Sequence, residues 1–60
     1  MEVWLIIIAL YSNSSGVLRD TQMREYVGEE RRCVQLMEMY KKGFERLKGV
    51  HVIGYCHRKK

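Results

Sequence analysis

Hydrophobic residues fill the first part of the chain without a break. Residues 3–11 read VWLIIIALY and hold no charged side chain, in a chain of which 30% is charged. The enrichment in β-branched and aromatic residues predicts a strand. A strand with one face in water alternates apolar and polar residues, and this one does not. Both faces of this strand must therefore be shielded from water or form an interface.

Polar residues then mark a turn and a second strand. The cluster at 12–16, SNSSG, is typical of a hairpin turn. Residues 17–26 follow as a second strand of mixed, partly charged composition. Charged side chains suit the edge of a sheet, where they discourage pairing with other chains.

A helical period occupies the centre of the chain. Gly28 is the expected N-cap, and Glu29 and Glu30 lie in the first turn, where carboxylates interact well with the helix dipole. Gly43 costs about 1 kcal/mol in a helix interior, so we expect the helix to end or bend there, with Gly49 as the final stop. The apolar stripe, with spacings of three and four, consists of Cys33, Leu36, Met37, Tyr40, Phe44 and Leu47.

The last segment, residues 50–58, alternates as a third strand. One face carries Val50, Val52, Gly54 and Cys56, and the other carries His51, Ile53, Tyr55 and His57. A right-handed crossover from the second strand to the third leaves a slot between them, and the first strand fits that slot. We therefore predict a single α+β domain, residues 1–60, with ββαβ order. Its antiparallel sheet has three strands in the order 2-1-3, with the helix on one face.

One helix covers one face of such a sheet, so the other face stays open. Both alternate sets of side chains in residues 3–11 are apolar, and the sequence does not decide which set is open. An apolar patch of this kind usually marks an interface. We expect a homodimer, sheet face to sheet face, or a protein partner. The alternative is that Tyr55 and the stem of Arg58 cover the patch.

Size and charge narrow the class of function. A chain of 60 residues has little room for an enzyme-style pocket of ~300 Å³ or more, so we expect a binding module without catalysis or cofactor. Residues 41–60 carry seven basic side chains and one acidic one, whereas residues 1–40 carry four basic and six acidic ones. A basic end can meet nucleic acid, an acidic protein or an anionic membrane, or serve solubility alone.

Two cysteines and two histidines are candidates for chemistry. Cys33 and Cys56 fall on core-facing stripes at the same end of the predicted fold. A disulfide between them would close a loop of about 24 residues and stabilise the fold by roughly 3 kcal/mol; two buried free thiols are the alternative. The spacing of the cysteines and histidines fits no zinc pattern, so we expect no metal.

An aromatic stripe is the feature that favours nucleic acid. His51, Tyr55 and His57 share a strand face, and Trp4 would join them in one of the two registers. Beside the basic C-terminus this is similar to sheets that stack single-stranded nucleic acid, although no RNA-binding sequence motif is present.

The opening apolar run is too short for a membrane span, which needs about 20 residues. Its flank holds Glu2 and no basic residue, unlike a signal peptide, and the chain starts at Met1. We therefore expect no membrane association and a cytoplasmic location.

The pattern as a whole resembles small proteins encoded by phages and prophages. The shared features are Trp4 before LIIIAL, the S-S-G hairpin at 14–16, the acidic helix start EERRC at 29–33, and a last strand, 50–60, that ends in basic residues. In size and layout the chain is also similar to phage inhibitors of bacterial RNA polymerase and to anti-CRISPR proteins. Many of those inhibitors are acidic mimics of nucleic acid, and this chain is basic, so mimicry of DNA is not expected.

The resemblance implies a non-catalytic inhibitor of a host or defence protein, acting in the host cytoplasm. A nucleic-acid-binding module and a structural homodimer are the alternatives. The residues that we expect to bind the partner are His51, Ile53, Tyr55, His57, Arg58 and Lys59.

Overall fold

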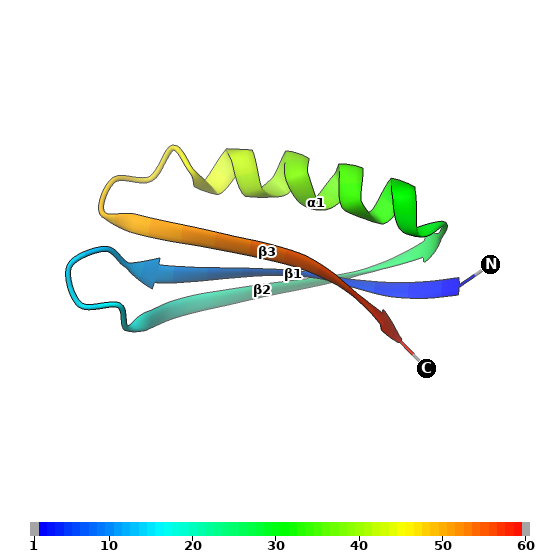
Figure 1. Ribbon diagram of the computed structural model, residues 1–60, viewed down its shortest axis with the longest axis horizontal. Helices are drawn as coiled ribbons and strands as arrows, with labels where there is room; N and C mark the ends of the chain where they lie inside the picture. The colour runs from blue at the N-terminus through cyan, green and yellow to red at the C-terminus, as the bar shows by residue number, and fades with distance from the viewer. Residues whose placement is uncertain (1, 60) are drawn as a thin grey trace.

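The fold is a twisted sheet with one helix along one of its faces (Figure 1). The computed structural model describes residues 2–59. In chain order the elements are β1 (Glu2–Ser12), β2 (Leu18–Gly28), α1 (Glu30–Phe44) and β3 (Val50–Lys59). The sheet order is β2-β1-β3, and both pairings are antiparallel. The predicted fold class, element order and strand order are thus confirmed.

The two faces of β1 have different roles, which the sequence left undecided. The residues of β1 that face α1 and are buried are Trp4, Ile6, Ile8 and Leu10. Side chains alternate across a strand, so the odd-numbered residues lie on the face away from α1. The uninterrupted apolar run of β1 therefore supplies both the core and the centre of a second, open surface.

Helix α1 is held against β3 and β1 by its buried stripe. Cys33 is fully buried and forms a disulfide with Cys56 of β3, with their Cα atoms 6.4 Å apart. Gly54 allows the helix to approach, because a Cβ at this position would lie 2.7 Å from Sδ of Met37 and 3.0 Å from Cδ1 of Ile8. Of the two alternatives for the cysteines, the structure contains the disulfide.

The helix begins one residue later than predicted, and it ends next to Gly43, where an end or a bend was expected. Gly28 is the last residue of β2, and Glu29 is the N-cap, without a side-chain capping hydrogen bond. The helix ends at Phe44, directly after Gly43, so Leu47 lies beyond it and is 51% exposed. The helix therefore ends one residue after Gly43, and Leu47 is not part of the apolar stripe of the helix.

Two glycines shape the loops at the far end of the sheet from the disulfide. Gly16 (φ 73°) closes the hairpin turn, and Gly49 (φ 77°) closes the turn before β3. Both adopt the left-handed conformation that disfavours residues with a Cβ. The backbone N–H of Asn13 donates to the carbonyl oxygen of Gly49 (3.0 Å), so the two loops are joined.

Candidate functional site

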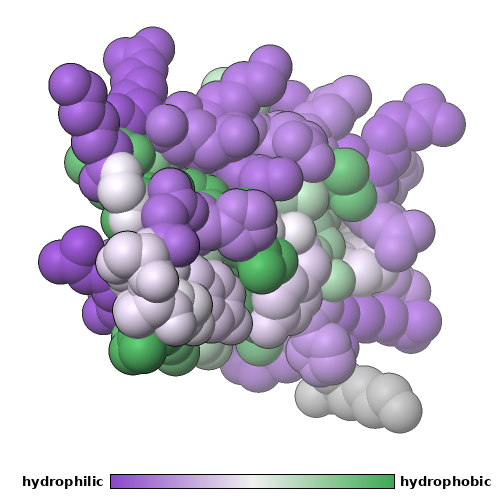
Figure 2. Space-filling model, turned by 60° about the vertical axis from the view of Figure 1, so that its left-hand side comes forward, coloured by the Kyte–Doolittle hydropathy of each residue, from purple (hydrophilic) through white to green (hydrophobic). Residues whose placement is uncertain are grey.

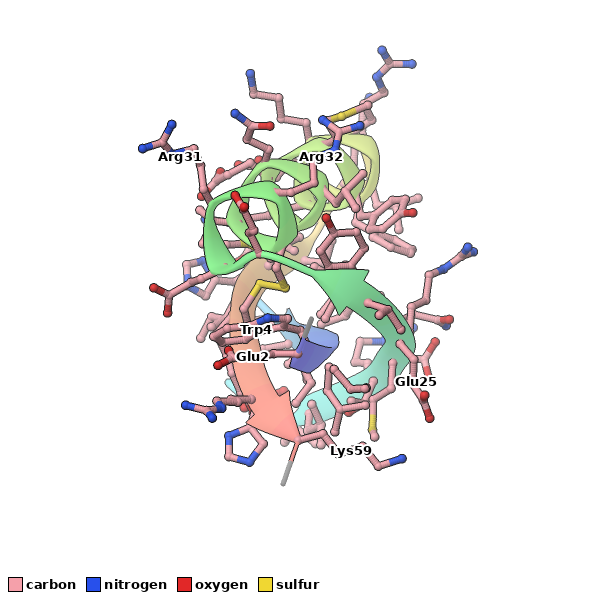
Figure 3. The ribbon with its side chains drawn as sticks, turned by 90° about the vertical axis from the view of Figure 1, so that its right-hand side faces the viewer. Glu2, Trp4, Glu25, Arg31, Arg32 and Lys59 are labelled. Carbon is pink, nitrogen blue, oxygen red and sulfur yellow. A yellow bond between two sulfur atoms is a disulfide. The ribbon has the colours of Figure 1, made fainter. Side chains whose placement is uncertain are left out.

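The sheet face opposite α1, here called the open face, is left uncovered by the other elements formed by residues 2–59 (Figure 3). Its central column, from β1, consists of Val3, Leu5, Ile7, Ala9 and Tyr11. The flanking column from β2 consists of Leu18, Thr21, Met23, Glu25 and Val27. The flanking column from β3 consists of His51, Ile53, Tyr55, His57 and Lys59.

The open face carries apolar side chains on all three strands, and polar ones lie among them at Thr21 and Glu25 of β2 and at His51, His57 and Lys59 of β3. On the outer strands Met23 is 59% exposed, Val27 56%, Tyr55 49% and Ile53 42%. The central column is partly buried because side chains of both neighbours flank it, and the small Ala9 is buried. In Figure 2 hydrophilic side chains crowd the top of the molecule, where the helix lies, and hydrophobic surface shows at the lower left.

One ion pair crosses the open face near its C-terminal end. The Lys59 Nζ lies 3.1 Å from Oε1 of Glu25. In the register, Lys59 pairs with Val3 and Glu25 pairs with Leu5, so the two side chains meet over β1 (Figure 3). Both side chains are more than half exposed, and a pair of this kind stabilises a fold by only about 0–1 kcal/mol. The pair balances one negative and one positive side chain on this face.

The structure brings five of the six predicted partner-binding residues together. His51, Ile53, Tyr55 and His57 lie on the open face, in the alternation read from the sequence, and Lys59 joins them. The sixth, Arg58, lies on the opposite face of β3.

Arg58 is directed to the helix side because strand residues alternate. It pairs in register with Trp4, and its Nη2 lies 3.2 Å from Oε1 of Glu2. The stem of Arg58 therefore does not cover the apolar patch, and Tyr55 lies within the patch and remains half exposed.

The aromatic stripe also differs from the expected set. Trp4 is absent from it: the indole is buried under α1, and its Nε1 donates to the carbonyl oxygen of Gly28 (3.2 Å). Tyr11 lies on the open face instead, in register with His51. The sequence could not place either residue because both alternate sets of β1 are apolar.

A second concave surface, which the sequence analysis missed, lies between α1 and β2. It is a groove of about 300 Å³, in which Ile6 and Ile8 of β1 and Tyr40 and Phe44 of α1 meet Arg24 of β2. The Arg24 guanidinium stacks over the Tyr40 ring, 5.1 Å from its centroid. The groove exists because α1 lies over β3 and β1, and a helical period does not reveal where a helix sits across a sheet.

Residues 2–59 show neither a metal-binding cluster nor a membrane-spanning helix. The side chains described contain no group of three or more His, Cys, Asp or Glu placed to hold a metal ion. In the same part of the chain, no helix has the length and apolar character needed to cross a membrane.

The comparisons with known proteins found no counterpart. No protein-family model matches the chain, no curated protein matches it, and no solved structure matches its fold. The similarity to phage proteins therefore stays a prediction, and a functional proposal has to rest on the geometry of the open face.

Proposed function

We propose that this protein is a non-catalytic binding protein that attaches to another protein through its open face. The observation that carries the proposal is the apolar centre of the open face across β2, β1 and β3, where Met23, Tyr55 and Ile53 are exposed on either side of β1. In keeping with the similarity to phage inhibitors, the partner in this proposal is a host or defence protein that the bound chain inhibits.

The size of the open face suits the centre of a protein interface. Strands of 10 and 11 residues span about 35 Å, and three of them side by side span about 14 Å, which gives roughly 500 Å². A stable interface buries about 800 Å² on each partner, with an apolar centre and a polar rim. The open face therefore supplies the centre, and surrounding loops and strand ends supply the rim.

Burial of this face would bring a substantial gain in free energy. Full burial of an aliphatic or aromatic side chain is worth about 1.5–3 kcal/mol relative to water. The side chains of Met23, Val27, Tyr55 and Ile53 are still 42–59% exposed. Much of the free energy of burying them would therefore be released only when a partner covers them. Part of it would be offset by the loss of translational and rotational freedom on association.

Charge supports a protein partner more than a nucleic acid at this face. Nucleic-acid binding relies on cations that are free to neutralise phosphates. On the open face Lys59 is already paired with Glu25, and Arg58 lies on the other side with Glu2. Among residues 2–59, His51, His57 and Tyr55 remain on this face as stacking groups, without a row of unpaired cations around them.

The test is affinity capture from a bacterial lysate, with and without nuclease. Tagged wild-type protein is compared with Tyr55→Ala, which removes a half-exposed ring from the open face. Met39→Ala is the matched control, because Met39 is 62% exposed but lies on α1, away from that face. Circular dichroism confirms that both variants keep the fold.

The proposal predicts a stoichiometric protein that survives nuclease treatment, binds the Met39→Ala variant and binds Tyr55→Ala at least about tenfold more weakly. Equal binding by both variants would remove the open face as the site. Recovery of nucleic acid alone, with an affinity that falls steeply with salt, would support the nucleic-acid alternative.

A further inference from the structure

The two edges of the sheet differ sharply in how they are protected. Edge strands expose unpaired N–H and C=O groups, and natural sheets protect them with charges, prolines or bulges. The β2 edge has such protection: it carries Arg19, Asp20, Arg24 and Glu25. The register between β1 and β2 also shifts between Leu10 and Tyr11, which leaves a bulge on the β2 side.

The β3 edge lacks these devices over most of its length. Residues 50–57 read VHVIGYCH, with no lysine, arginine, aspartate, glutamate or proline. Basic residues occur only at the end of the strand, at Arg58 and Lys59. A long, uncharged edge of this kind is a template for another strand.

The position of α1 leaves room for such pairing. Cys33 is bonded to Cys56 of β3, and Met37 lies against Gly54 of β3 and Ile8 of β1, so the helix lies over the boundary between these two strands. If a second β3 joined the edge, the two helices would lie about two strand spacings apart, or about 10 Å. That separation is the usual distance between packed helices.

We propose that β3 pairs antiparallel with β3 of a second copy, so that two three-stranded sheets form one continuous sheet with a two-fold axis. The uncharged segments, residues 50–57, lie opposite each other around that axis, and the basic ends lie at its two extremes. The two open faces then lie side by side on one surface. This contact differs from the face-to-face dimer expected from the sequence, and it is independent of the proposed function.

The test is the oligomeric state of the full chain by sedimentation equilibrium, from micromolar to millimolar concentration. The double variant Ile53→Lys/Tyr55→Lys would place like charges opposite each other around the two-fold axis, where they repel. The matched control, Thr21→Lys/Met23→Lys, adds the same charge to the open face of β2. All four sites are exposed, so both variants should fold.

We expect a wild-type dimer whose dissociation constant rises about tenfold or more in the β3 variant and stays within about threefold in the β2 variant. A wild-type protein that remains monomeric over the whole range would overturn the proposal. Equal weakening by both variants would also overturn it, because that result indicates a face-to-face dimer.

Amide hydrogen exchange keeps the test decisive if the β3 variant does not fold. For the wild-type protein, exchange in β3 should slow as the concentration increases, while exchange in β2 should not change. Slowing in β2, or no slowing in either edge strand, would contradict pairing through β3. Neither outcome bears on partner binding by the open face, which is measured separately with Tyr55→Ala.

Discussion

At the scale of single residues, the close contacts below the helix depend on a glycine. Gly54 has no Cβ, and the space that one would take is filled by Met37 and Ile8. Gly43, by contrast, has open space around the position of a Cβ, and it lies within α1. The two glycines therefore make a matched pair, in which one is required by packing and the other weakens its helix.

We predict opposite effects of alanine at these two positions. Gly54→Ala should lower the free energy of unfolding by about 1 kcal/mol, because Met37 must move, and Gly54→Val by about 2–3 kcal/mol. Gly43→Ala should raise the free energy of unfolding by about 0.5–1 kcal/mol through helix propensity. Urea unfolding curves measure both. A Gly54→Ala protein as stable as wild type would contradict the packing described.

The indole ring of Trp4 is buried, and its only polar group, the Nε1–H, has a hydrogen-bond acceptor. It is the only tryptophan, it is 6% exposed, and its Nε1 donates to Gly28. We predict blue-shifted fluorescence that is insensitive to aqueous quenchers. Trp4→Phe should cost about 1–3 kcal/mol of stability, because it leaves a cavity and an unpaired carbonyl oxygen. Emission typical of a water-exposed indole would place Trp4 on the open face instead.

At the scale of elements, alternation and periodicity predicted more than composition did. The alternation in β3 correctly assigned His51 and Tyr55 to one face of the strand and Val52 to the other, because the two faces differ in polarity. In β1 the same reasoning failed, since residues on both faces are apolar and nothing distinguishes Trp4 from Leu5. The start of the helix was also missed, because Gly28 fits a strand end as well as an N-cap, whereas the expected end or bend at Gly43 agrees with the observed end at Phe44.

The position of α1 across the width of the sheet could not be predicted from the helical period. It depends on the fit of Met37 against Gly54 and on the disulfide at Cys33. These contacts join segments far apart in sequence. The groove beside β2 follows from that position and was not predicted, whereas the predicted strand order 2-1-3 already made β3 an edge strand.

The disulfide connects α1 to β3 and should increase the free energy of unfolding by restraining these two elements. It joins residues separated by 23 positions, so the loop-entropy model gives about 3 kcal/mol. We predict that dithiothreitol lowers the free energy of unfolding by about that amount. Cys33→Ala/Cys56→Ala should behave like the reduced protein, with a further loss from the cavity at Cys33. Identical unfolding curves with and without reductant would contradict this role.

At the scale of the whole molecule, the fold divides its surface into two regions of different character. Helix α1 carries charged side chains such as Arg31 and Arg32 (Figure 3), whereas the centre of the open face is apolar and its two charged residues, Glu25 and Lys59, pair with each other. A small domain gains little stability from leaving such a face in water. We therefore expect the molecule to act through its open face.

Ile7 is the position that tests this claim most directly. It lies at the middle of the open face, in register with Met23 on one side and Tyr55 on the other. A lysine at Ile7 would place a charge at the centre of the interface, where loss of a central contact costs about 2 kcal/mol or more. Val34→Lys is the control, because Val34 is an exposed residue of α1.

The decisive measurement is the affinity of these two variants for the captured partner, by isothermal titration at moderate salt, with circular dichroism confirming the fold. We expect Ile7→Lys to weaken binding by about thirtyfold or more, while Val34→Lys binds like wild type. Unchanged binding by a folded Ile7→Lys protein, or equal loss in both variants, would contradict the open face as the binding site.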